Sequence, residues 1–342
     1  MSTRAFIAGV SGLGLTAEEQ QFLRAERPWG FILFKRNVDH PAQVTDLVRQ
    51  LRACVGDDEA PVLIDQEGGR VQRLAPPHWP AYPAGARFGE LYAGDSGAGC
   101  RAAWLASRLI AADLADLGIT VDCLPLADVP VPGADAVIGD RAYGTDPAQV
   151  AALARAVTDG LADGGVLPVL KHIPGHGRAT ADSHLRLPTV DTPLAELERT
   201  DFAAFRQLSD LPMAMTAHVV FSALDAAQPA TTSATIISKV IRGWIGFQGV
   251  LMSDDVSMNA LAGSIAERAE AAFAAGCDVV LHCNGKLDEM RAVAAVSPFL
   301  AGEAETRARR AIAARRAPQP FDRAAGRREL DGLLAQAKGL SA

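Results

Sequence analysis

Short apolar runs alternate with longer amphipathic segments along almost the whole chain. Eight runs have the length of a β-strand, and the segments between them show helical periodicity. The runs are residues 5–10, 30–34, 61–65, 119–124, 167–171, 212–217, 249–254 and 278–283. Regular alternation of strands and helices indicates a parallel sheet, and eight repeats is the number that closes a barrel. The sequence therefore predicts an α/β protein with a (β/α)₈ TIM-type barrel.

The segments between these runs predict the helices that cover the sheet. We expect helices over residues 16–26, 41–54, 99–117, 147–160, 193–208 and 264–276. Thr16 and Glu19 have the spacing of a capping box, which favours a helix start at that point. Two runs, VLPVL and GVLMS, are apolar on both faces, as strands of a helix-covered parallel sheet are.

One domain is expected over residues 1–342, because no low-complexity block or Pro/Ser-rich linker divides the chain. Residues 303–340, rich in Arg and Ala, predict a helical tail on the outside of the barrel. A formal net charge of −7 without a long basic run argues against a nucleic-acid partner. No stretch approaches the roughly 20 apolar residues of a membrane span. Five scattered cysteines are expected to be reduced thiols in a cytoplasmic protein.

Polar residues follow five of the eight predicted strands, at the end where a parallel barrel gathers its reactive groups. They are Asp65, Lys171-His172, Thr216-Ala-His218, Ser253-Asp-Asp255 and Asn284-Gly285. The densest stretch is residues 171–184, KHIPGHGRATADSH, which holds three of the seven histidines. Pro174, Gly175 and Gly177 exclude a continuous helix there. We therefore expect a polar loop beyond the fifth strand.

Two motifs could indicate a metal or a nucleotide. His172 and His176 have the spacing of a helical zinc site, but Pro174 and Gly175 break the helix that such a site needs. Residues 9–14 follow a G-x-x-G-x-G order, which is neither the dinucleotide fingerprint nor a phosphate-binding P-loop. We therefore expect no metal and no cofactor.

The spacing of polar residues in the loop and in the seventh strand suggests a candidate proton donor and candidate nucleophiles. In an extended Asp182-Ser183-His184 the first and third side chains lie on the same side, so the carboxylate can orient the imidazole. Such an imidazole is a suitable proton donor near neutral pH. On the seventh strand only one of Asp254 and Asp255 can point the same way as positions 250 and 252. The spacing alone does not choose between them.

The motifs together resemble glycoside hydrolase family 3. They are Asp65-Gln-Glu-Gly-Gly-Arg70 with Arg73, Gly139-Asp-Arg-Ala-Tyr143, Lys171-His-Ile-Pro-Gly-His-Gly177, Asp182-Ser-His184, Met215-Thr-Ala-His218 and Ser253-Asp-Asp-Val-Ser-Met258. The match spans essentially the whole chain in order, and is closest to the bacterial single-domain branch of β-N-acetylglucosaminidases. Ile173 and Val256 depart from the family pattern, each by one apolar residue for another.

The resemblance implies a retaining exo-β-N-acetylglucosaminidase, a β-hexosaminidase that forms a covalent glycosyl-enzyme. It makes Asp254 the nucleophile, His184 the general acid/base and Asp182 the residue that orients His184. The implied sugar-binding residues are Asp65, Arg73, Arg141, Lys171 and His172. The implied substrate is a peptidoglycan fragment, GlcNAc linked to 1,6-anhydro-MurNAc with or without peptide, cleaved in cell-wall recycling. The sequence does not show the oligomeric state, and we expect a monomer.

The remaining candidates receive supporting roles or none. His176 is expected to shape the loop, His218 to lie behind the site, and Asp255 to be a structural carboxylate. His40, His78 and His282 are not expected to act. Two other functions stay open: a β-N-acetylglucosaminide phosphorylase, because a histidine acid does not repel phosphate as a carboxylate would, and a non-catalytic muropeptide-binding module.

Overall fold

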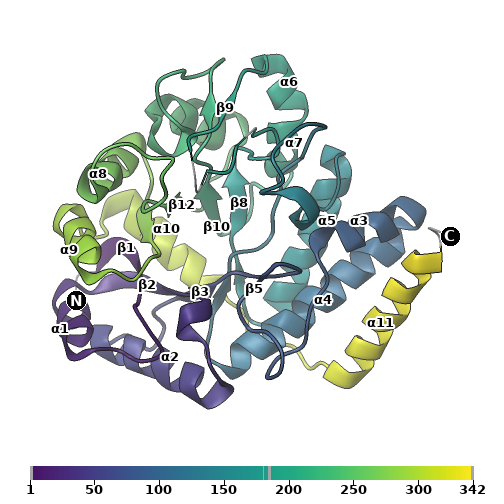
Figure 1. Ribbon diagram of the computed structural model, residues 1–342, viewed down its shortest axis with the longest axis horizontal. Coiled ribbons are helices and arrows are strands. Elements are labelled where there is room, and N and C mark those ends of the chain that lie inside the picture. The colour runs from purple at the N-terminus through teal and green to yellow at the C-terminus, as the bar shows by residue number, and fades with distance from the viewer. Residues whose placement is uncertain (1–2, 180, 184–185, 340–342) are drawn as a thin grey trace.

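The computed structural model describes residues 3–179, 181–183 and 186–339 and shows a parallel barrel surrounded by helices (Figure 1). The strand order is β7-β6-β3-β2-β1-β13-β12-β10-β8. The strands are β1 (Arg4–Gly9), β2 (Pro28–Leu33), β3 (Val62–Ile64), β6 (Val121–Asp122), β7 (Leu167–Pro168), β8 (Leu170–Ile173), β10 (Met213–Thr216), β12 (Val250–Asp255) and β13 (Val279–His282). β7 and β8 belong to one chain segment, interrupted only at Val169, so the two ends of this order meet and the barrel closes. The predicted fold class and all eight strand positions are confirmed.

Helices follow the strands as predicted, with two additions and one break. They are α1 (Ala17–Glu26), α2 (Pro41–Val55), α3 (Gly85–Gly94), α4 (Ser96–Asp116), α5 (Pro147–Asp163), α6 (Leu194–Arg199), α7 (Asp201–Arg206), α8 (Ile265–Ala275) and α9 (Leu287–Val296). The capping box is confirmed: the Thr16 hydroxyl accepts the Glu19 N–H at 3.1 Å, and Glu19 accepts the Thr16 N–H at 2.8 Å. The sequence missed α3 and α9. The helix predicted over residues 193–208 is broken at Thr200, where the backbone leaves helical geometry.

The core has two layers because strand side chains alternate between the two faces. Ile7, Ile32 and Met252 point into the barrel and fill its interior. Their neighbours Phe6 and Phe31 face outward and pack beneath the helices. The interior is therefore solid up to the C-terminal ends of the strands, where polar residues replace the apolar ones.

The predicted tail forms two helices, α10 (Gly302–Ala313) and α11 (Arg323–Gly339). Ala308 and Ala311 of α10 belong to the same apolar cluster as the barrel interior, and Arg307 pairs with Asp278 at the start of β13 (3.0 Å). α10 therefore covers the N-terminal ends of the strands, at one end of the barrel. α11 packs on α4, and Glu329 of α11 accepts two hydrogen bonds from Arg101 of α4.

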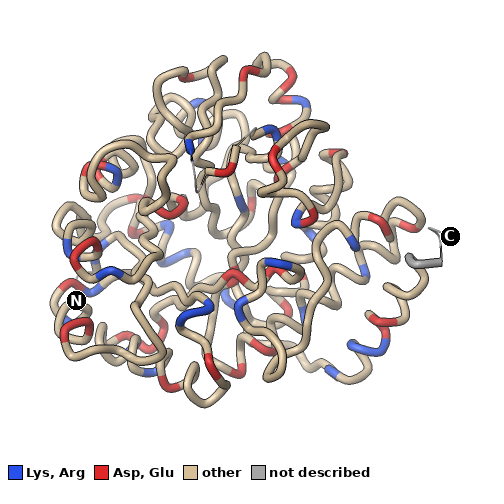
Figure 2. Tube along the Cα trace, in the orientation of Figure 1, with Lys and Arg blue, Asp and Glu red and all other residues tan. Residues whose placement is uncertain are grey.

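Short extra elements rise from the C-terminal ends of the strands. They are the hairpin of β4 (Gln66–Gly68) and β5 (Val71–Gln72), the turn η2 (Gly139–Arg141), the parallel pair β9 (Thr189–Val190) and β11 (Val220–Phe221), and the turns η1 (Lys35–Asn37) and η3 (Ala230–Thr232). The π-helix η4 (Ile236–Trp244) instead lies between β10 and β12 in the chain, and its apolar side chains pack in the layer between the sheet and the helices. Acidic and basic positions are interspersed around the molecule (Figure 2). No helix within the described ranges is long and apolar enough to cross a bilayer.

Candidate active site

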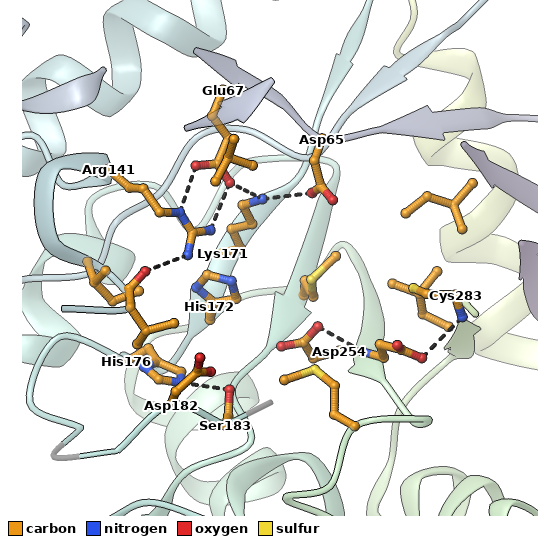
Figure 3. A pocket seen from close by; sticks show the side chains of 18 of the residues that line it. Asp65, Glu67, Arg141, Lys171, His172, His176, Asp182, Ser183, Asp254 and Cys283 are labelled. Atoms are coloured by element: carbon orange, nitrogen blue, oxygen red, sulfur yellow. Dashed lines mark hydrogen bonds and ion pairs between the residues drawn. The ribbon is translucent and has the colours of Figure 1, made fainter. Parts of the chain in front are cut away.

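A cavity of about 340 Å³ opens at the C-terminal ends of the barrel strands (Figure 3). This volume is at the lower end of the roughly 300–1,000 Å³ typical of small-molecule sites. The predicted site residues among its lining are Asp65, Arg73, Arg141, Lys171, His172, Asp182 and Asp254. The predicted acid, His184, lies outside the described residues. The structure thus brings all the other predicted residues to one cavity, although they come from five separate parts of the chain.

Lys171 is the central cation of one wall, which we call the ion-paired wall: Asp65, Glu67, Arg73, Arg141 and Lys171. Its side chain is 2% exposed, and Nζ lies 3.0 Å from Asp65 Oδ1 and 2.6 Å from Glu67 Oε1. Burial alone would lower the pKa of Lys171, but these two carboxylates outweigh it and raise the pKa above its usual value. Lys171 is therefore a permanent cation that can only donate hydrogen bonds.

The two carboxylates of the wall are each held by two cations. Arg73 Nη2 donates to Asp65 Oδ2 at 2.9 Å, and Arg141 donates to both oxygens of Glu67 at 2.8 Å (Figure 3). Burial would raise the pKa of Asp65, yet Lys171 and Arg73 hold it well below its usual value. The pKa of Glu67 is likewise lowered, because the charges of Lys171 and Arg141 outweigh its burial. The wall is fixed in geometry and fully ionised at neutral pH.

Asp128, which follows β6, anchors the segment that leads from β8 into the loop. Its fully buried carboxylate lies 2.7 Å from His172 Nδ1 and accepts the backbone N–H of His176 at 2.7 Å. Gly177 permits this close approach, because a Cβ there would lie 2.1 Å from the Val129 carbonyl oxygen. The polar loop that follows β8 therefore packs against the residues that follow β6.

His176 links this anchor to the loop. Its ring is buried, and Nε2 lies 3.1 Å from the Ser183 hydroxyl, beside Asp182 (Figure 3). Burial, with the neighbouring His172, lowers the pKa of His176 to about 4. The ring is neutral near pH 7, so it lacks the second ring proton that an imidazolium could give to a leaving group. The geometry agrees with the predicted role of His176 in shaping the loop.

The two aspartates at the end of β12 have different surroundings. Asp255 accepts the Ser257 N–H (3.0 Å), the Ser257 hydroxyl (2.6 Å) and the Cys283 N–H (3.1 Å). Its carboxylate therefore closes a turn, as expected. Both aspartates line the cavity, although the Asp255 carboxylate is directed to Ser257 and Cys283. The register between β12 and β13 shifts between Met252 and Asp255, and such a bulge interrupts strict alternation.

The backbone of Asp254 is fixed at the mouth of the barrel. Its N–H donates to the Thr216 hydroxyl at 3.2 Å, and its Oδ1 accepts the Asp255 N–H at 2.8 Å. The Thr216 hydroxyl also lies 2.8 Å from that of Thr231, which in turn contacts His218 Nδ1 at 2.7 Å. His218 is completely buried, behind the site as predicted. A chain of buried polar groups thus supports the strand end that carries Asp254.

Residues 10–315 match the family described as "Glycosyl hydrolase family 3 N terminal domain". The chain belongs to glycosyl hydrolase family 3. It is similar to the β-hexosaminidase of Bordetella avium, with 41% identity over 281 residues, covering 80% of this chain and 79% of that one. It is also similar to the β-hexosaminidase of Neisseria gonorrhoeae, with 39% identity over 292 residues, covering 83% and 80%. The predicted enzyme class, a β-hexosaminidase, is confirmed.

Solved structures of family 3 support the same assignment. NagZ from Neisseria gonorrhoeae in complex with N-trifluoroacetyl-D-glucosamine superposes with a TM-score of 0.84 at 32% identity, covering 100% of this chain and 99% of that one. A family 3 β-N-acetylglucosaminidase from Paenibacillus gives a TM-score of 0.83 at 29% identity, covering 97% of this chain and 66% of that one. The barrel and its connections are therefore those of family 3.

The sequence did not identify Glu67 or Asp128 as site residues of this family 3 chain. Glu67 lies two residues beyond the third predicted run in a motif that was noted, so its position was a usable signal. Asp128 lies four residues beyond the fourth predicted run, and nothing in the local pattern marks it. Within the described ranges, no group of three or more His, Cys, Asp or Glu has a metal-binding arrangement. The absence of a metal stays a prediction, which unchanged activity in EDTA would support.

Proposed function

We propose that this family 3 enzyme is a retaining exo-β-N-acetylglucosaminidase acting on peptidoglycan fragments. The substrate would be GlcNAc linked to 1,6-anhydro-MurNAc, with or without peptide, in cytoplasmic cell-wall recycling by a monomer. The observation that carries the proposal is the cavity itself, where Asp254 and Asp182 lie opposite a wall of ion-paired hydrogen-bond donors (Figure 3). NagZ of Neisseria gonorrhoeae, crystallised with an N-acylated glucosamine, supports the same kind of sugar here.

The first step uses Asp254 as the nucleophile. Its carboxylate attacks the anomeric carbon from below while the bond to the leaving oxygen breaks, through an oxocarbenium-like transition state. His184, oriented by Asp182, gives a proton to the leaving oxygen. In the second step, neutral His184 takes a proton from water, which displaces Asp254 from the sugar. The two inversions at the anomeric carbon give net retention.

The ion-paired wall would hold the sugar during both steps. Lys171, Arg73 and Arg141 offer N–H donors to sugar oxygens, while Asp65 can accept from a hydroxyl. These groups already occupy fixed positions through their mutual contacts, so little reorganisation is needed on binding. A cavity of about 340 Å³, closed at its base by the barrel interior, favours an exo mode that removes one terminal sugar at a time.

Product analysis tests the proposal. The enzyme is incubated with chitobiose and with a GlcNAc–anhydro-MurNAc peptide, each with and without phosphate, and products are followed by NMR and mass spectrometry. We expect free GlcNAc, formed first as the β-anomer, at a rate independent of phosphate. GlcNAc 1-phosphate would assign a phosphorylase instead, α-GlcNAc an inverting enzyme, and no turnover of either substrate a binding module.

A further inference from the structure

The ion-paired wall contains strong donors, but a sugar hydroxyl also needs an acceptor for its own proton. His172 lies directly beside Lys171, between that residue and His176 (Figure 3). Its side chain is 10% exposed and lines the cavity. Whether this ring donates or accepts depends on which nitrogen carries the proton. The residue that determines which nitrogen is protonated is Asp128, which contacts the ring but does not line the cavity.

Asp128 determines whether Nδ1, on the buried edge of the His172 ring, donates or accepts a hydrogen bond. Its Oδ2 lies 2.7 Å from His172 Nδ1, while Oδ1 accepts the backbone N–H groups of His176 (2.7 Å) and His172 (3.3 Å). Burial would raise the pKa of Asp128, but the His172 imidazole and the His176 N–H outweigh burial and lower it. An ionised carboxylate accepts only, so Nδ1 of His172 must be the donor.

The other edge of the ring faces the cavity. Within the described part of the chain, Nε2 of His172 makes no hydrogen bond, and it is also absent from the buried atoms that lack a partner. This nitrogen is therefore accessible from the cavity. In the neutral ring with Nδ1 protonated, Nε2 carries a bare lone pair. Lys171, a donor of the ion-paired wall, then lies beside His172 Nε2, an acceptor.

We propose that Asp128 is a positioning residue that fixes the proton of His172 on Nδ1 and presents Nε2 as the acceptor for a sugar hydroxyl. The proposal rests on the proposed function, since it takes the ligand of the cavity to be a sugar. It adds which groups donate and which accept hydrogen bonds. One sugar hydroxyl donates to His172 Nε2, while the cations of the ion-paired wall donate to sugar oxygens. A sugar lacking that hydroxyl would leave Nε2 unpaired.

Asp128→Asn tests the assignment with almost no change in shape. The amide oxygen must remain at Oδ1, because two backbone N–H groups point at it, so the amide nitrogen faces His172 Nδ1. The ring then has to move its proton to Nε2, which turns the acceptor into a donor. We expect kcat/KM on an aryl β-GlcNAc substrate to fall about tenfold to hundredfold, the usual factor for leaving a buried polar group mismatched.

Asp122→Asn is the matched control, since this residue ends β6, six residues before Asp128, and is also fully buried. Burial raises the pKa of Asp122 well above its usual value, which favours the uncharged acid that an amide resembles. Its Oδ1 accepts the Gln66 N–H at 3.0 Å, which an amide oxygen preserves. We expect kcat/KM to change less than about twofold, as for substitutions that keep their partners.

Two measurements separate positioning from a merely structural role. With ¹⁵N-labelled histidine, His172 should show a protonated Nδ1 and a bare Nε2 in the wild type, and the reverse in Asp128→Asn. In a His172→Phe background, Asp128→Asn should change kcat/KM less than about threefold, because its effect passes through His172. A wild-type ring protonated on Nε2, or an equal loss in both backgrounds, would overturn the proposal. If the wild type cleaved no glycoside, the proposed function would fail, but the NMR experiment would still decide the position of the proton.

Discussion

Two walls of the same cavity are built in different ways. The ion-paired wall comes from β3, the β4–β5 hairpin, η2 and β8, and its charged side chains are held by one another. The opposite side comes from β12 and from the loop that follows β8. Within its described residues that loop is held by a backbone N–H donated to Asp128, by the His176–Ser183 contact and by ion pairs of Arg178 with Asp201 and Glu196, which do not line the cavity. The first wall is suited to hold a sugar, and the second carries the groups proposed for the chemistry.

The difference implies that binding and chemistry can be impaired separately. Removing one member of the ion-paired wall leaves buried charges without partners, so both stability and affinity should suffer. Removing a reacting group at the other side takes away one step of catalysis and leaves the fold intact. The following changes test this separation.

Asp254→Asn should have the largest effect on rate. Loss of the nucleophile should lower kcat by at least about 10⁴-fold, since removal of a catalytic nucleophile costs several orders of magnitude. The melting temperature should change little, because Asp254 lies at a strand end. Steady-state rates and thermal unfolding check both expectations.

Asp255→Asn is the matched control for Asp254. Its carboxylate closes the turn to Ser257 and Cys283, so this change should lower the melting temperature. It should retain far more activity than Asp254→Asn. If Asp255→Asn were the more inactive of the two, the assignment of the nucleophile would be reversed.

His184→Ala should have the next largest effect, and its size should depend on the leaving group. General acid catalysis contributes about 10²–10⁴-fold, so that loss is expected for a poor leaving group. A dinitrophenolate needs little protonation, and its release should be far less impaired. Asp182→Ala should follow the same trend more mildly, because the imidazole remains. Single-turnover rates over a series of aryl glycosides measure the trend, and equal slowing of good and poor leaving groups would show that His184 is not the acid.

Lys171→Met should affect the other wall, where affinity and stability change together. It leaves Asp65 and Glu67 without their shared cation, and breaking a buried pair costs about 3–5 kcal/mol of unfolding free energy. KM should rise as well. Arg291→Met removes an exposed partner of Asp288 and should stay within about 0.5 kcal/mol. Urea unfolding of both variants gives the comparison, and equal small effects would contradict a preformed wall.

The pH dependence of stability should report the same wall. The pKa values of Asp65 and Glu67 are lower in the folded protein than their usual values. Their contribution is therefore complete above the unfolded pKa values and is lost as pH falls through the folded ones. Unfolding free energy should decrease on acidification below about pH 5. Glu67→Gln should flatten this decrease in urea titrations, and an unchanged slope would show that Glu67 does not contribute.

More of the fold than of the site could be predicted from the sequence. Apolar runs such as that ending in Asp65 mark each strand, and eight of them define a barrel without any knowledge of contacts. The same pattern could not place α10, because an amphipathic tail fits the outside of a barrel as well as its end. It also could not find Asp128, whose role depends on a backbone approach at Gly177 that joins residues far apart in sequence. The register shift at Asp254 and Asp255 depends on how β12 pairs with β13, and the sequence of β12 alone does not show this pairing.

Trapping the covalent intermediate tests the central proposal most directly. The wild-type enzyme is incubated with a fluorinated GlcNAc donor that carries a good leaving group, then digested with trypsin. Cleavage after Arg242 and Arg268 yields peptide 243–268, which contains both Asp254 and Asp255. Fragmentation of this peptide should place one sugar mass on Asp254. A sugar on Asp255, on another peptide or on no residue at all would contradict the account.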